Sequence, residues 1–246
     1  MTNHMTDEAF YRYRWWALIG LGMALVILNL DLTIVNLALP ILGQTFHTKL
    51  SMLQWISNIY SLAFASLVML TGKLADRYGH RLVYLIGVVF FFLGSCIAGF
   101  APNVAVIILG RLFQGIGMAG TFGMVFILAN NAFPPEQRGL AVGLLVALAG
   151  IAQAVGPTAG GMIIDHWGWR WAFLVNLPFC IVSFVLVYWI CQNKSSRQKF
   201  SIHYPSALLL ILIYFIVVVA FNEVQSWGAT SLRFLAIMAA AIVVFV

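Results

Sequence analysis

Long apolar stretches alternate along the chain with short polar segments. Three of these stretches contain no Asp, Glu, Lys or Arg, and they run for 26, 23 and 23 residues, at 139–164, 171–193 and 200–222. A helix needs about 20 apolar residues to cross a bilayer. Each of the three stretches is therefore long enough to form one membrane-spanning helix.

Turn signals between the apolar stretches divide the chain into helices. We predict seven spanning helices and the start of an eighth at about residue 233. The seven lie near 15–40, 51–71, 82–100, 104–130, 139–164, 171–192 and 204–222. The period-two alternation typical of the strands of a membrane β-barrel is absent. The pattern therefore predicts an all-α polytopic membrane protein.

Composition excludes a soluble domain. Hydrophobic residues make up 63% of the chain and charged residues 8%, against about 25% charged residues in a typical soluble domain. The sequence contains no HExxH motif, phosphate-binding loop or Ser/His/Asp arrangement, so we predict that the protein is not an enzyme. Cys96, Cys180 and Cys191 lie in or at the end of apolar stretches, where packing is the simplest role. We expect no cofactor and no metal site.

The positive charges are unevenly distributed between the two sides of the predicted helices. Nine of the 13 Lys and Arg residues fall on the side of the N-terminus: Arg12, Arg14, Lys73, Arg77, Arg81, Arg138, Lys194, Arg197 and Lys199. Cytoplasmic loops of membrane proteins carry this excess, which predicts a cytoplasmic N-terminus. The expected location of this multi-pass protein is a bacterial inner membrane. The same loops account for most of the net charge of +6, so no nucleic-acid partner is expected.

Two charged residues lie inside predicted spans. Asp31 is in VILNLDLTIVNLALP, residues 26–40, and Arg111 is in the helix predicted at 104–130. A charge at a helix centre costs roughly 2.5 to 3.5 kcal/mol in a bilayer. At about 1.5 Å per residue, Arg111 lies about 12 Å and Asp31 about 13 Å from the same membrane side. Opposite charges at similar depth favour a shared, partly wet cavity.

Two interpretations of this charged pair remain open. The pair is a structural contact that fixes helix packing, or Asp31 is a carboxylate whose protonation is linked to transport. The two interpretations are compatible.

Five sequence segments resemble signatures of one family. GKLADRYGHR, residues 72–81, resembles the loop between helices 2 and 3 of the major facilitator superfamily, with His80 where Arg or Lys is usual. LGRLFQGIGMAG, residues 109–120, resembles its helix-4 motif, and GIAQAVGPTAGG, residues 150–161, resembles the helix-5 motif of its antiporters. LDLTIVNLALP and WGWRWAFLVNLPF resemble signatures of its fourteen-helix drug/proton antiporters.

The resemblance implies a fold and a division of the chain. The fold is the six-helix N-terminal bundle of this superfamily, made of two inverted three-helix repeats, with one extra transmembrane helix and the start of another. The expected segments are a cytoplasmic N-terminus (1–14), the six-helix half (15–192), a cytoplasmic linker (193–203) and an extra helix pair whose second member is truncated (204–246). The expected partner is the missing C-terminal half of a full-length transporter.

The resemblance also implies three groups of site residues. The proton-coupling site and substrate cavity comprise Asp31, Asn36, Arg111 and Gln114. The cytoplasmic gate comprises Gly72, Asp76, Arg77, Gly79 and Arg81. The antiporter motif of the fifth helix comprises Gly150, Gly156, Pro157, Gly160 and Gly161, which form a bend and a seam facing the partner half. The plainer alternatives are a solvated charged loop for the second group and close helix packing for the third.

The expected function is proton-coupled efflux of hydrophobic or amphipathic drugs or metabolites by alternating access, performed as half of a full transporter. The expected partners are a small hydrophobic substrate, protons and the lipid bilayer. Two alternatives remain. The chain is a truncated membrane fragment that does not transport, or it belongs to an uptake or export carrier for a specific metabolite.

Overall fold

The computed structural model describes residues 13–191 and four single residues beyond them, 209, 216, 231 and 236. Six helices in this part of the chain are long and apolar enough to cross a membrane, which confirms the first six predicted helices. The elements are α2 (Arg14–Phe46), α3 (Leu50–Tyr78), α4 (His80–Gly99), α5 (Val104–Ala132), the 3-10 turn η1 (Pro135–Gln137), α6 (Arg138–Trp167), α7 (Trp171–Leu174) and α8 (Asn176–Ile190). The predicted linker, the seventh and eighth helices and most of the predicted N-terminal segment lie outside the described residues.

The first helix is longer than the sequence predicted. α2 runs for 33 residues and continues through Pro40 to Phe46, so the prediction that it ends at Pro40 was wrong. A proline removes one backbone donor, and neighbouring helices in a membrane bundle make this loss tolerable. Asp31 consequently lies near the middle of α2, about 23 Å from its end at about 1.5 Å per residue, rather than 13 Å.

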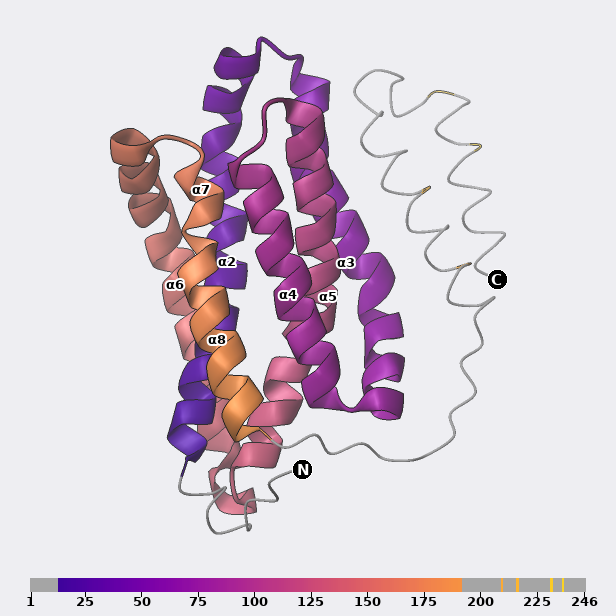
Figure 1. Cartoon of the computed structure of the whole chain (residues 1–246), viewed down its shortest axis with the longest axis vertical. Helices are drawn as coiled ribbons and strands as arrows, with labels where there is room; N and C mark the ends of the chain where they lie inside the picture. Colours follow the sequence, from indigo (N-terminus) through magenta and orange to yellow (C-terminus); the bar gives the residue numbers. More distant parts are fainter. Residues whose placement is uncertain (1–12, 192–208, 210–215, 217–230, 232–235, 237–246) are drawn as a thin grey trace.

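The helices run alternately up and down through the bundle (Figure 1). The most extensive contacts join α4 to α5, α3 to α5, α2 to α6 and α2 to α8. If α2 is exchanged with α5, α3 with α6 and α4 with α8, the same four helix pairs result. That symmetry is the one expected of two inverted three-helix repeats, with α2 and α5 as their first helices.

Close contact between α4 and α5 depends on glycines from both helices. A Cβ atom at Gly94 would lie 2.5 Å from the carbonyl oxygen of Gly110. A Cβ atom at Gly117 would lie 2.5 Å from the backbone nitrogen of Phe91. Small residues of this kind let two helix backbones approach each other in a membrane. The two repeats are therefore joined where no side chain separates the backbones.

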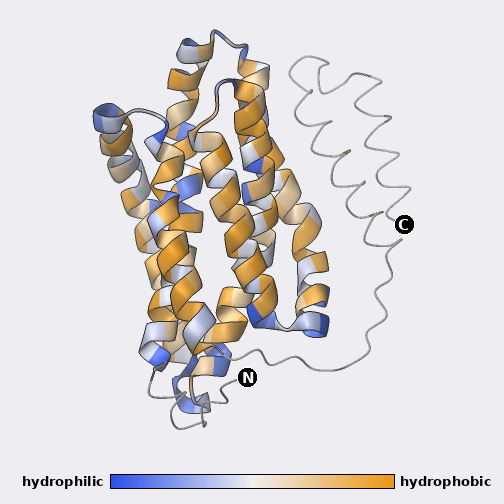
Figure 2. Cartoon of the chain, viewed as in Figure 1, coloured by the Kyte–Doolittle hydropathy of each residue, from blue (hydrophilic) through white to orange (hydrophobic). Residues whose placement is uncertain are grey.

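Five buried polar residues separate two hydrophobic clusters in the core. One cluster contains residues near the N-terminal end of α2, such as Leu21 and Leu28, and the other contains residues further along it, such as Ile34 and Leu42. The five residues that lie between the clusters in each helix are Asp31, Ser95, Arg111, Gln114 and Asn176, and we call them the polar layer. Figure 2 shows that hydrophobic residues predominate along the helices and hydrophilic residues are concentrated near their ends. The polar layer is thus enclosed on both sides by apolar packing.

Candidate functional site

A buried ion pair joins α2 to α5 inside the bundle. Arg111 Nη1 donates to Asp31 Oδ2, and the two side chains are 1% and 0% exposed. The two charges found in the sequence are therefore in contact, enclosed by protein rather than facing the partly wet cavity that was expected. Because both are buried, removal of one partner leaves the other charge without compensation.

The guanidinium group of Arg111 has three further contacts. Its Nε donates to the backbone carbonyl of Ile56 in α3 at 3.1 Å, and its Nη1 also donates to Gln114 Oε1 at 2.9 Å. Its central carbon lies 4.0 Å from the centre of the Tyr60 ring, a cation–π contact. α3 and α5 therefore hold the guanidinium group independently of Asp31.

Two amide side chains hold the carboxylate of Asp31. Gln114 Nε2 and Asn176 Nδ2 both donate to Asp31 Oδ1, at 3.1 and 2.9 Å. The same two nitrogens donate to Ser95 Oγ, at 2.9 and 3.2 Å. The polar layer is thus one hydrogen-bonded network that links α2, α4, α5 and α8. Hydrogen bonds to a charged group in such a site are stronger than those between neutral groups.

Sequence reasoning selected three of the five residues in the polar layer and missed Ser95 and Asn176. Asn176 lies in the WGWRWAFLVNLPF segment, and an amide inside an otherwise apolar span was the available signal. Ser95 gives a weaker signal, because single serines are common where membrane helices pack together.

Asn36 lies outside the polar layer. Its Nδ2 donates to the backbone carbonyl of Leu32 at 2.9 Å, and its Oδ1 accepts from Ser57 Oγ of α3 at 3.1 Å. Two turns earlier on α2, Asn29 Oδ1 accepts from Gln153 Nε2 of α6 at 3.1 Å. These pairs are exposed, so the structure places Asn36 on an open side of α2 and does not bring it to the ion pair.

The segment at residues 72–81, predicted to be a loop, is almost entirely helical. α3 continues to Tyr78, α4 begins at His80, and Gly79 alone separates them with a φ of 102°. This conformation favours glycine, so Gly79 makes the turn as expected. Gly72 lies within α3, and its predicted role as a turn residue was wrong, because a helix tolerates one interior glycine at a cost of about 1 kcal/mol.

Two charged residues of the predicted gate contact residues that are close to them in the sequence. Asp76 Oδ1 lies 3.4 Å from Nε2 of His80, across the turn between α3 and α4. The guanidinium carbon of Arg77 lies 5.3 Å from the centre of the Tyr78 ring. Both contacts are within the α3–α4 corner.

The third charged residue of this group contacts a distant part of the chain. Arg81 Nη2 donates to the backbone carbonyl of Tyr188, near the end of α8. Its guanidinium carbon also lies 4.9 Å from the centre of the Tyr188 ring. Arg81 therefore links the start of α4 to the end of α8.

Two glycines of the antiporter motif pack against α2. A Cβ atom at Gly156 would clash with Thr33 Oγ1, and one at Gly160 would lie 2.7 Å from Ile34 Cγ1. Both glycines therefore allow α6 to approach α2 within the same half. The expectation that the whole seam faces a partner half was wrong for these two residues.

The other residues of this motif are placed differently. A Cβ atom at Gly150 or Gly161 would have no atom within 4 Å, so both lie on a side of α6 that nothing described covers. Pro157 lies inside α6, and the helix continues through it to Trp167.

These features define the class of protein. A bundle of two inverted three-helix repeats with a charged pair in its core is the architecture of half a secondary transporter. Within the described part of the chain, no three His, Cys, Asp or Glu side chains gather closely enough to hold a metal ion. Residues 21–246 match the Major Facilitator Superfamily, and the chain belongs to this family. This family consists of membrane transporters and not of enzymes.

Relatives of this chain include proteins named for drug resistance. The chain is 37% identical over 221 residues to "Multidrug resistance protein Stp" of Mycobacterium tuberculosis (strain CDC 1551 / Oshkosh), covering 88% of this chain and 40% of that protein. It is 33% identical over 232 residues to "Tetracenomycin C resistance and export protein" of Streptomyces glaucescens, covering 94% of this chain and 43% of that protein. The chain thus spans less than half the length of these relatives.

A solved structure has the same fold. The chain superimposes on a crystal structure of peptide transporter POT in complex with sulfate with a TM-score of 0.64. The match covers 94% of this chain and 52% of that chain, at 10% sequence identity. At this identity the similarity concerns the fold alone.

The network around Asp31 predicts that Asn176→Leu destabilises the protein. The substitution removes a donor to the buried carboxylate and to Ser95, and such losses cost about 1–3 kcal/mol. Thermal unfolding of the purified chain, followed by circular dichroism, should show a lower midpoint. Gln153→Leu removes an exposed amide and should change stability by no more than about 0.5 kcal/mol. An equal loss in both variants would contradict a special role for the polar layer.

Proposed function

We propose that this chain is the N-terminal half of a proton-coupled exporter of hydrophobic or amphipathic compounds that works by alternating access. The names of the two relatives, which concern drug resistance and export, support the direction and the substrate class. Alternating access requires a second six-helix half. The proposal assigns that half to a longer protein that contains this chain, with residues 204–246 as an extra helix pair.

The observation that carries the proposal is the ion pair in the polar layer. A buried carboxylate in a membrane protein is costly, and such residues mark proton and substrate pathways. Asp31 is fully buried and pairs with Arg111 across the two repeats. If Asp31 is the proton-linked carboxylate, its protonation changes the contact between α2 and α5, the first helices of the two repeats.

Protonation of Asp31 changes the balance of contacts on the two helices unequally. The neutral acid attracts Arg111 far less than the carboxylate does, whereas the contacts of Arg111 with Ile56, Gln114 and Tyr60 remain. Proton binding therefore loosens α2 from α5 while α3 and α5 stay joined through Arg111. This selective loosening couples the proton to a movement of α2 in the proposed mechanism.

The exposed side of α2 provides the proposed substrate surface. Asn29 and Asn36 offer isolated polar groups there, paired with Gln153 of α6 and Ser57 of α3. Leu37, beside Asn36, is 41% exposed. Sites that bind small molecules combine largely apolar walls with a few polar groups. This combination suits hydrophobic or amphipathic substrates.

The proposed orientation places the N-terminus in the cytoplasm of a bacterium. Nine Lys and Arg residues on that side of the predicted spans support it. In this orientation, the α3–α4 corner with Gly79, Asp76, Arg77 and Arg81 lies at the cytoplasmic face and acts as a gate. Gly150 and Gly161, on the uncovered side of α6, then face the second half.

The proposal predicts that Asp31→Asn abolishes efflux in the full-length transporter. The change keeps the size of the side chain but removes its charge and its exchangeable proton. Efflux driven by a pH gradient should be lost, whereas substrate affinity should stay within about tenfold, or roughly 1.4 kcal/mol. Efflux from vesicles and substrate binding to the purified protein measure the two effects separately.

The double variant Asp31→Asn/Arg111→Gln is the control for this prediction. Loss of one partner of a buried ion pair destabilises a protein by about 3–5 kcal/mol, and removal of both charges relieves much of that cost. Membrane abundance should therefore recover in the double variant, while efflux stays lost. Full recovery of efflux in the double variant would mean that the pair is structural only.

A second prediction concerns the proposed gate. Asp76→Asn in the full-length transporter should reduce transport at unchanged abundance, because a charge at the gate changes the balance between inward-closed and inward-open states. His80→Gln removes the ring that contacts Asp76 and leaves the carboxylate in place. If His80→Gln reduces transport as much as Asp76→Asn does, the local contact rather than the gate charge explains the effect.

A further inference from the structure

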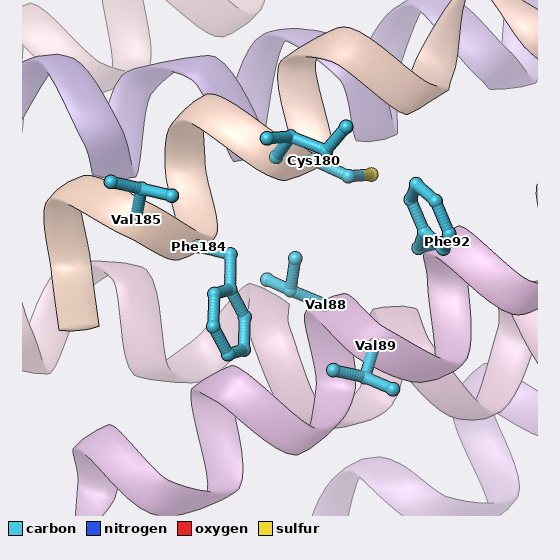
Figure 3. A pocket seen from close by; sticks show the side chains of 7 residues that line it. Val88, Val89, Phe92, Cys180, Phe184 and Val185 are labelled. Carbon is cyan, nitrogen blue, oxygen red and sulfur yellow. The ribbon is translucent and has the colours of Figure 1, made fainter.

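A groove lies between α4 and α8, away from the polar layer. It encloses about 200 Å³, which exceeds the apolar cavity of about 150 Å³ that holds a benzene molecule in an engineered protein. Its lining includes Val88, Val89 and Phe92 of α4 and Phe184 and Val185 of α8. Figure 3 shows these side chains around the pocket, with the Cys180 thiol beside them. The groove therefore has room for a segment of hydrocarbon chain.

The groove is open to the outside of the bundle. Val89, Ile181 and Val185 line it, and they are 42%, 53% and 44% exposed. α4 and α8 are membrane-spanning, so the surroundings of this opening are the hydrocarbon tails of the bilayer. The natural occupant is an acyl chain.

A positive charge lies at the end of the same helix pair. Arg81 begins α4 and contacts Tyr188 at the end of α8. Its contacts are a backbone carbonyl and an aromatic ring, and among the described residues no carboxylate lies within ion-pair distance of it. An anionic group at this position would complement the charge of Arg81.

The distance between the charge and the groove matches one phospholipid. Val88 and Phe92 follow Arg81 by 7 and 11 residues, or about 10 and 17 Å along the helix. The hydrocarbon core of one leaflet is about 15 Å thick, half of about 30 Å. With Arg81 at the level of the headgroups, the groove lies at the depth of the acyl chains of the same leaflet.

We propose that the groove between α4 and α8 binds one acyl chain of an anionic phospholipid whose phosphate pairs with Arg81. The lipid lies in the leaflet on the side where α4 begins. Its acyl chain fills a gap in the packing between α4, the third helix of one repeat, and α8, the third helix of the other. The lipid site shares Arg81 with the proposed gate, but lipid binding itself does not require transport.

The test is lipid binding to the purified full chain, measured by native mass spectrometry. The chain in mild detergent is titrated with dioleoylphosphatidylglycerol or with dioleoylphosphatidylcholine. We expect one phosphatidylglycerol molecule to bind at least fivefold more tightly than phosphatidylcholine. Arg81→Gln should weaken phosphatidylglycerol binding about fivefold, equivalent to roughly 1 kcal/mol for one basic residue at the membrane surface. Arg77→Gln, which removes the same charge from the same corner, should weaken it less than twofold.

A second pair of variants tests the groove itself. Val89→Trp fills the groove and should abolish tight binding of phosphatidylglycerol. Leu93→Trp on the same helix should not, because Leu93 is similarly exposed, at 44% against 42%, but does not line the groove. Ile181→Trp fills the groove from the other wall and replaces Val89→Trp if that variant does not fold. Helical content by circular dichroism identifies folded variants.

Several results would overturn the proposal. Equal weakening of phosphatidylglycerol binding by Arg77→Gln and Arg81→Gln would indicate nonspecific electrostatic attraction to the α3–α4 corner. Unchanged lipid binding in folded Val89→Trp and Ile181→Trp would exclude the groove. A dimer without bound lipid that Val89→Trp dissociates would assign the groove to a second copy of the chain.

Discussion

The contact between Asp31 and Arg111 is the constraint around which the rest of the bundle is arranged. Each charge is costly at this depth without the other, and the pair brings together the first helices of the two repeats. Ile56 and Tyr60 add α3, Ser95 adds α4 and Asn176 adds α8 to the same network. α6 joins through α2, against which its glycines pack. Every spanning helix of the described chain is thus positioned relative to one ion pair.

The two hydrophobic clusters strengthen the interaction between Asp31 and Arg111. Apolar packing on both sides excludes water from the polar layer, which strengthens the attraction between the two charges. In the proposed mechanism, the same burial makes the packing of α2 sensitive to a single proton. The structural role of the pair and its proposed coupling role are then two consequences of one arrangement. The groove between α4 and α8 is a different kind of feature, because it concerns the contact of the bundle with its lipid surroundings.

The sequence predicted the membrane-spanning helices well because their main determinant is local. Apolar length and charge asymmetry are properties of continuous segments, and so the six described spans were found. The ends of the spans were less predictable. α2 continues through Pro40 and α3 through Gly72, because packing against other helices outweighs the local preference of one residue.

The site was predictable only in part, for a related reason. Asp31 and Arg111 are conspicuous as charges in apolar stretches, whereas Ser95 and Asn176 become important only through their contacts. Those contacts depend on how each helix is rotated about its axis, which a single sequence does not give. The same rotation decides that Gly156 and Gly160 pack against α2 while Gly150 and Gly161 do not.

Proton release on substrate binding tests the role of Asp31 most directly. In weakly buffered solution, hydrophobic substrate added to the purified full-length transporter should release protons. The carboxylate of Asp31 loses its proton when substrate binds in this account, so proton binding and substrate binding are linked. Asp31→Asn has no proton to exchange, so it should bind substrate with little or no release. Unchanged proton release by Asp31→Asn, at equal substrate binding, would contradict the assignment of proton coupling to this residue.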